Sequence, residues 1–331
     1  MFKKINLQLF AATVQTTLLG DLTAEMKTFY DMTLIDEAQA SLVHDQFGQK
    51  RPIPKNGGKT IEFRKFAALA KATTPLTEGV TPDGKGLKVS TITATVNQYG
   101  DYITQSDVLE LTSLDNTILE ATKLLGRQAG LTLDTIVRDV LQSGTNVTYC
   151  PKVAADGTET AVTSRTGLDA TCQLTVKVLQ QVVAKLRAQN APTIGGKYVA
   201  IIHPYVAYDL MRDPEWIDAH KYASPDNLYE GEIGEIAGVR FVQTSEAKIY
   251  DGGIFGTLVF GEGAYGVTEI TGGGLQTIVK QKGSAGTADP LDQRSSVGWK
   301  AIKTAELLIP QYLVRVESKS AVFSTSDLKA N

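Results

Sequence analysis

The sequence is poor in the residues that build disulfide frameworks and metal centres. It has only two cysteines, Cys150 and Cys172, and three histidines, His44, His203 and His220, in 331 residues. Two isolated cysteines give neither a disulfide framework nor a CxxC metal motif, and reduced thiols are the default in a cytosolic product. An intrachain bridge between them stays open, because they flank one polar excursion of the chain. No histidine has a metal-ligating partner two to four residues further on, so we expect no metal site.

Long apolar runs and a strong net charge are also missing. No stretch approaches the roughly 20 apolar residues of a membrane-spanning helix, so we expect no membrane partner. The start, MFKKINLQLFAATVQTT, imitates a secretory signal, but Asn6 and Gln8 interrupt its short apolar run. The net charge of -3 argues against a basic nucleic-acid binder as a whole. With 42% hydrophobic residues the chain can still bury a sizeable core.

Catalytic motifs are absent or weak. The sequence has no GxSxG, Walker or kinase motif. GEGAYG at 261–266 matches GxGxxG, but strand-like VTEI follows it, where a dinucleotide site needs a helix N-terminus for the pyrophosphate. We interpret it as a glycine-rich bend between strands and predict no catalytic residue and no cofactor. A nucleotide-dependent cytosolic enzyme is kept as a remote alternative.

Apolar periodicity predicts a mixture of helices and strands. Helices are expected as one or two short pieces within 21–47, a long one at 113–142 that Gly126 and Gly130 could kink, one at 173–190 and one from residue 205. Strands are expected at 60–66, 90–104, 197–204, 238–245, 256–270 and 274–282, with a helix and then a strand in 297–318. PDGKG at 82–86 reads as a tight turn, so 50–104 forms one long hairpin. The irregular alternation indicates an α+β fold.

Charge is segregated along the chain. Residues 50–100 carry nine basic against three acidic side chains, a net charge of +6. Residues 101–120 carry five acidic and no basic side chains, and residues 203–236 carry eight acidic against two basic ones, which gives -5 and -6. These segments are either ordinary solvated faces or complementary patches, with the basic hairpin of one copy meeting an acidic surface of another.

The order of these segments resembles the major capsid proteins of tailed bacteriophages, the Hong Kong 97-type fold that is shared with encapsulin shells. KKINLQLFA (3–11) is similar to N-termini of such proteins. IHPYVAYDLMRDPEW (202–216), GEIGEIAGVRFVQTS (231–245) and VGWKAIKTAELLIPQYLVRVES (297–318) resemble axial-domain and C-terminal segments of one capsid subfamily. The resemblance implies an N-terminal arm with short helices (1–49), an extended E-loop hairpin (50–104), a peripheral domain (105–172) with its spine helix at about 113–142, an axial domain (173–290), and a C-terminal return (291–331).

The resemblance also implies a function. The chain would be a structural major capsid protein, with no enzymatic role, whose copies form pentamers and hexamers of an icosahedral or prolate head around double-stranded DNA. It would occupy the host cytoplasm before assembly and the virion capsid afterwards. A separate scaffolding protein and a portal are implied as partners, with or without a decoration protein. An encapsulin-like nanocompartment shell is the alternative of the same fold.

In the family the E-loop reaches over an adjacent subunit, which would explain a long hairpin with few apolar residues. The candidates for intersubunit contact are therefore basic residues of the hairpin and acidic residues of 203–236: Arg64, Lys71, Lys85, Lys88, Asp209, Asp213, Glu230, Glu232 and Glu235. Some members cross-link an E-loop lysine to an asparagine, and Lys71, Lys85 and Lys88 are candidates by location alone, with no matching acceptor. We expect residues 1–20 to lie against neighbouring subunits.

Overall fold

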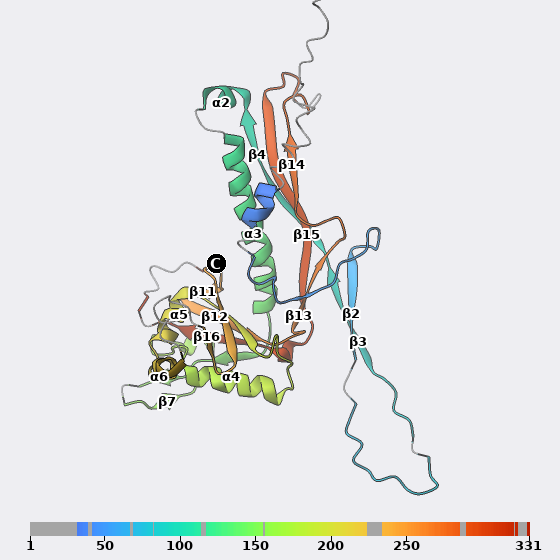
Figure 1. Ribbon diagram of the computed structural model, residues 1–331, viewed down its shortest axis with the longest axis vertical. Coiled ribbons are helices and arrows are strands. Elements are labelled where there is room, and N and C mark those ends of the chain that lie inside the picture. The colour runs from blue at the N-terminus through green and yellow to red at the C-terminus, as the bar shows by residue number, and fades with distance from the viewer. Residues whose placement is uncertain are drawn as a thin grey trace, which may run out of the picture. The chain divides into compact units, whose positions relative to one another are not determined.

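A computed structural model describes residues 32–38, 42–66, 69–81, 83–113, 117–154, 156–223, 234–284, 289–320, 322–323 and 330–331. The chain divides into two compact units, and each gathers three separate stretches. The first consists of 1–40, 100–130 and 275–300, and the second of 41–99, 131–274 and 301–331. The finer division into five segments stays a prediction. Figure 1 shows the helices and strands by their labels.

The first unit contains a short helical stretch at 32–38, helix α2 (Asp107–Thr112), the first half of helix α3 (Thr117–Gln142) and three strand segments. Strands β4 (Asn97–Ser106) and β14 (Gln276–Lys280) both pair with β15 (Arg294–Leu307). Glycines let β4 and β15 approach closely: a Cβ on Gly100 would lie 2.5 Å from the Trp299 carbonyl oxygen. The side chains of this sheet therefore leave a hollow over the two strands.

The predicted long helix is confirmed as α3, which is continuous through both glycines. Gly126 does not interrupt it. A Cβ at this position would lie 2.9 Å from the carbonyl oxygen of Leu34, so the glycine lets residues 32–38 pack against the helix. Arg127 Nε donates to Glu37 Oε2 at 2.9 Å at the same contact. Glycine was thus needed for close packing rather than for a bend.

The second unit is built on a seven-stranded sheet with the order β5-β16-β12-β8-β10-β9, in which β11 pairs with β12. Figure 1 labels β11, β12 and β16 of this sheet. These strands are β5 (Val147–Tyr149), β8 (Tyr198–Ile202), β9 (Glu235–Ile236), β10 (Val239–Gln243), β11 (Ile249–Tyr250), β12 (Ile254–Phe260) and β16 (Leu313–Lys319). Helices α4 (Val176–Ala188) and α5 (Pro204–Met211) follow the predicted positions, and α6 (Pro214–Ala223) is a further helix that was not predicted. A two-stranded hairpin, β6 (Lys152–Val153) with β7 (Glu159–Thr160), and the short helices η2 (Arg165–Gly167) and η4 (Pro310–Tyr312) complete this unit.

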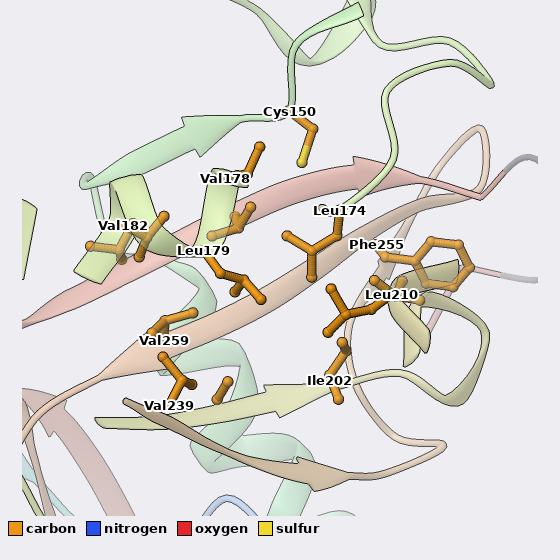
Figure 2. Packing of buried hydrophobic residues seen from close by; sticks show 14 of the residues in the cluster. Cys150, Leu174, Val178, Leu179, Val182, Ile202, Leu210, Val239, Phe255 and Val259 are labelled. Carbon is orange, nitrogen blue, oxygen red and sulfur yellow. The ribbon is translucent and has the colours of Figure 1, made fainter. Parts of the chain in front are cut away.

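The sheet buries both of its faces, because side chains along a strand alternate between the faces. Ala200 and Ile202 of β8 belong to a core with the apolar stripe of α4 (Figure 2). Val199 and Ile201 belong to a second core with Val137 and Leu141 at the end of α3. This explains why YVAII reads as a continuous apolar run rather than an alternating one.

The C-terminal stretch corrects one prediction. Residues 297–307, expected to be helical, belong to β15, a 14-residue strand. In the second unit β15 pairs antiparallel with β13 (Tyr265–Glu269), and β13 pairs in parallel with β1 (Gln49–Lys50). Its alternating burial, with Val297, Trp299, Ala301, Lys303 and Ala305 buried, fits a strand with one covered face. The apolar residues of VGWKAIKTAELL fit helical spacing, but they also alternate with polar or small residues as in a strand. The two patterns cannot be distinguished in so short a stretch, and the helix was the wrong choice.

Candidate assembly surface

The base of the predicted hairpin is an antiparallel pair, β2 (Thr60–Phe66) with β3 (Val89–Thr95), in which Phe63 faces Ile92 and Ile61 faces Ala94. Phe63 and Ala94 are buried, and they pack with Leu308 just after β15. The base therefore covers one face against its own unit. The expected returning strand, 90–104, is two strands, because buried Val96 interrupts it and its N–H bonds to Lys59 O at 3.0 Å.

Beyond this base the hairpin is open to solvent. We call residues 69–81 and 83–88 the distal arm; every one of them is exposed. Leu69, Leu76, Val80 and Leu87 are 59%, 77%, 63% and 69% exposed, which leaves an apolar segment without cover in the single chain. A tight turn forms at Thr77–Val80, where Val80 N bonds to Thr77 O and Gly79 has φ +77°. Of the predicted turn at 82–86, residue 82 lies outside the described residues, and residues 83–86 show no turn.

The basic candidates lie on this open hairpin. Lys71, Lys85 and Lys88 belong to the distal arm, and none has an ion-pair partner among the described residues. Arg64 is exposed at the base and lines a cavity of about 160 Å³ with Arg51 above Phe63, Ile92, Leu308 and Ile309. The structure thus places these cations where a second copy can reach them.

The acidic candidates of 203–236 are mostly engaged inside their own unit. Asp209 is buried, which raises the pKa of its carboxyl. Asp213 accepts from Val176 N at 2.8 Å and from Glu215 N at 3.1 Å, so it holds the starts of α4 and α6. Glu235 pairs with Lys197. Glu230 and Glu232 lie outside the described residues. As contact candidates these five carboxylates stay a prediction, although Asp209 and Asp213 are already engaged within their own unit.

The other acidic segment, 101–120, offers a free surface. Its helix α2 exposes three apolar side chains, Val108, Leu109 and Leu111, to 62%, 47% and 82%. Asp107 begins this helix, and exposed Asp101 accepts from Gln128 Nε2 at 2.7 Å and from Tyr102 N at 2.8 Å. These hydrogen bonds lower the pKa of Asp101 and keep it ionised. Apolar side chains and fixed negative charge thus lie together in this segment.

A hollow of about 520 Å³ lies beside Asp101 on the sheet of the first unit. Gly100, Gly298, Tyr102, Ile278 and Lys280 line it, with Ser296 and Trp299. The two glycines let β4 and β15 approach closely at this point. The Asp101 carboxylate also lines the hollow, so the hollow combines apolar side chains with a negative charge that a basic, leucine-containing arm would match.

Comparison with known proteins gives the family. The phage capsid protein family matches residues 88–305, about two thirds of the chain. The chain belongs to this family. The solved capsid of cyanophage Pam1 is similar at a TM-score of 0.68 and 14% identity, covering 87% of this chain and 93% of that one. The capsid of cyanophage P-SCSP1u gives 0.66 and 14%, covering 84% and 88%. No curated protein matches the sequence.

The protein is therefore a structural major capsid protein of the virion, with an α+β capsid fold. The same fold extends to a virus-like particle from Pyrococcus furiosus, which matches at a TM-score of 0.51 and 12% identity over 88% of this chain and 99% of that one. At these identities the solved structures show the fold alone. The family match to phage capsids supports the phage assignment over the nanocompartment alternative.

Buried polar groups anchor the chain that leads into the hairpin of this capsid protein. Asp134 on α3 accepts from His44 Nδ1 at 2.7 Å and from the backbone N–H groups of Val43 and His44. Lys303 on β15 pairs with Asp45 at 3.0 Å, and Tyr265 donates to the His44 carbonyl at 2.5 Å. Sequence reasoning missed these contacts, since the partners lie about 90 to 260 residues apart and no local pattern marks them.

The same capsid protein holds no catalytic arrangement in its described part. GEGAYG is the bend between β12 and β13, as predicted, with Gly263 at φ +71°. His203 caps α5, where its Nδ1 accepts from Tyr205 N at 3.1 Å, and His44 is paired with Asp134. No three His, Cys, Asp or Glu side chains of the described residues could hold a metal ion. None of the helices there is long and apolar enough to cross a membrane.

Proposed function

We propose that copies of this capsid protein form pentamers and hexamers of an icosahedral or prolate head, and that the distal arm of one copy covers residues 101–120 of a neighbour. The observation that carries this proposal is the distal arm itself, which is long, apolar in part and wholly exposed in the single chain. Soluble monomers rarely leave such segments uncovered, so a partner surface is expected.

The chemistry of the two surfaces supports this pairing. Fully burying one leucine or valine side chain contributes about 1.5–3 kcal/mol, so four such residues on the arm can supply most of the attraction. Each exposed ion pair adds only about 0–1 kcal/mol, but charge complementarity fixes register and disfavours wrong docking. Closed symmetry then repeats every contact in each subunit, so weak pairs accumulate over the shell.

The remaining partners follow from the family resemblance. We propose a separate scaffolding protein and a portal as assembly partners, packaged double-stranded DNA as the content, and the host cytoplasm as the place of assembly. A decoration protein is compatible with this architecture. The subunit acts by binding its neighbours, and it performs no catalysis.

Electron microscopy of the purified chain tests the proposal. We expect closed shells of uniform diameter when the chain is produced with its scaffolding protein, and irregular or fewer shells without it. Heads isolated after infection should contain nuclease-protected double-stranded DNA. A folded chain that stays monomeric in both preparations would contradict the proposal, and uniform empty shells that hold a second protein as cargo would favour the nanocompartment alternative.

A further inference from the structure

Cys150 and Cys172 lie next to each other on one edge of β16, although 21 residues separate them in the chain. Strand β5 runs parallel to β16, and the N–H of Cys150 bonds to the Glu317 carbonyl at 3.0 Å. In a regular parallel ladder the carbonyl of Cys150 would then accept from the N–H of Lys319. Here the carbonyl of Cys172 accepts that bond, at 2.9 Å. The chain therefore leaves the edge at Cys150 and returns to it at Cys172.

Both side chains enter the same apolar core. Each cysteine is fully buried and free, and both belong to the cluster formed by α4 and the seven-stranded sheet. Figure 2 shows the sulfur of Cys150 directed toward Val178 and Leu174 of this cluster. Adjacent positions on a strand edge are separated by about 3–7 Å, which includes the Cα separation of roughly 4.4–6.8 Å that a disulfide requires.

We infer that Cys150 and Cys172 are a dithiol pair that an external disulfide compound, such as oxidised glutathione, converts into an intrasubunit bridge. One thiolate attacks a glutathione sulfur, forms a mixed disulfide and releases one glutathione thiolate. The second cysteine thiolate then attacks the protein sulfur and releases the other glutathione. The two cysteines lose two electrons and two protons, and the oxidised glutathione becomes two reduced molecules. This redox site goes beyond the assembly function.

The disulfide would join the two ends of the segment between Cys150 and Cys172, and an ion pair already attaches this segment to β16 near residue 165. Arg165 of η2 donates from Nε and Nη2 to the buried carboxylate of Glu317 at 2.8 and 2.6 Å, and its guanidinium stacks on Tyr250 at 3.6 Å. Because this ion pair fixes Arg165, which lies between the two cysteines in the chain, to β16 without the bridge, oxidation needs little rearrangement. A disulfide between Cys150 and Cys172 would mainly restrict the conformations of the unfolded chain and slow the unfolding of the segment between them.

The surroundings of the thiols make the reaction slow at neutral pH. Burial raises the pKa of both the Cys150 and the Cys172 thiol. The carboxylate of Asp169 lies 3.6 Å from the Cys172 sulfur and is itself paired with Lys152 at 2.8 Å. Few thiolates therefore form in a reducing cytosol, and the bridge is expected in released particles that meet external oxidants.

Thiol mapping on assembled shells tests the inference. Shells are incubated with oxidised glutathione at neutral and at mildly alkaline pH, then denatured, alkylated and digested without reduction. We expect a peptide pair joined through Cys150 and Cys172, loss of both alkylatable thiols, and faster loss at the higher pH. The melting temperature of the oxidised shells should rise by about 5–10 °C and fall again after reduction.

Single variants supply the matched controls. Cys150→Ala and Cys172→Ala shells should form no bridge and should show no such rise in melting temperature. If a variant does not assemble, the wild-type peptide map alone decides. Wild-type shells that keep both thiols, under conditions that oxidise the urea-unfolded chain, would overturn the inference. A bridge that joins different subunits would overturn it as well.

Discussion

Single buried side chains decide how firmly the hairpin base is held. Asp134 has no exposed surface and accepts three hydrogen bonds, two from the backbone and one from His44. Each donor would be left unpaired in the interior if the carboxylate were removed, and unpaired buried polar groups are costly. The residue therefore joins the chain before the hairpin to the second half of the spine helix.

We predict that Asp134→Ala lowers the free energy of unfolding of the unassembled subunit by about 3–5 kcal/mol, as expected when one partner of a buried pair is removed. Asp134→Asn should lower the free energy of unfolding by less, since the amide oxygen of asparagine can still accept a hydrogen bond from the backbone. Urea titration followed by circular dichroism measures both. Glu120→Ala, on the same helix but exposed and paired only with Lys123, is the control and should change less than about 1 kcal/mol. Equal effects at both positions would contradict this role.

The stability of the second unit should also depend on pH through His203. Burial lowers the pKa of His203 to about 4, against an ordinary value of 6.5. Between these values the unfolded chain binds a proton that the folded chain does not, so stability falls as the pH drops from 6.5 to 4. We predict that roughly 2–3 kcal/mol is lost over this window.

The substitution His203→Asn isolates that contribution. Asparagine can still cap α5 but does not titrate, so the loss between pH 6.5 and 4 should shrink. Urea midpoints at several pH values measure it. An unchanged pH profile in the variant would assign the acid sensitivity to other groups.

At the residue scale, the sequence predicted a local bend better than it predicted contacts. The bend at GEGAYG follows from local context, which the sequence contains. The engagement of Asp209 and Asp213 does not, because burial and helix capping depend on segments that are distant in the chain. Charge counted along the sequence therefore did not show which of the described carboxylates are engaged within their own unit.

At the scale of secondary-structure elements, the helices were easier to predict from the sequence than the strands. Helices α3, α4 and α5 were predicted, since each has an apolar stripe and a recognisable end. Strand β15 was not predicted, because a helix was expected at the start of 297–318. Its pairing with β4, β13 and β14 overrides the local preference of its residues for a helix. The hairpin was predicted, but with bounds that were too wide. Strands β2 and β3 pair only within 60–95, while β1 pairs with β13 and β4 pairs with β15. The turn of the hairpin and the break at Val96 depend on backbone hydrogen bonds that composition does not encode.

The distal arm can be removed without disturbing the hairpin base. Phe66 and Val89 face each other across β2 and β3, so an Asn-Gly turn can join them in place of residues 67–88. We predict that this variant folds, with a melting temperature close to that of wild type, but does not close shells. Electron microscopy and analytical ultracentrifugation measure assembly. Normal shells from this variant would show that the arm makes no required contact.

Charge reversal on the same arm tests its partner. We predict that Lys85→Glu with Lys88→Glu slows assembly several-fold, because both residues would then repel the acidic segment 101–120, while monomer melting stays unchanged. Light scattering at low and high salt follows the rate, and the difference should shrink at high salt, where screening acts over about 3 Å.

Second-site changes identify the surface. Asp107→Lys should partly restore assembly of the reversed arm, whereas Asp218→Lys on α6 should not. Rescue by Asp218→Lys instead would place the arm near residues 203–236. If the reversed arm assembles as fast as wild type at low salt, the charged segments are solvated faces only.

At the scale of the whole molecule, the N-terminal residues 1–20 lie outside the described part of the chain, and their contact with neighbours stays a prediction. We expect their amide hydrogens to exchange much more slowly in assembled shells than in free subunits. Hydrogen exchange with mass spectrometry measures the difference, and residues 69–88 serve as an internal comparison, since the arm should show the same protection. Equally fast exchange in both states would show that this segment makes no intersubunit contact.

The order of strands in the seven-stranded sheet constrains when the subunit can fold during synthesis. Strand β16 is the last strand in the described part of the chain, yet it lies between β5 and β12, and β14 and β15 complete the sheet that β4 joins. Ribosome-bound chains that end before residue 294 should therefore be digested rapidly by protease, whereas chains that include β16 resist it. Pairings between distant segments form late. Newly made subunits would thus become able to associate only after residue 319 has left the ribosome, which delays the growth of the particle relative to translation.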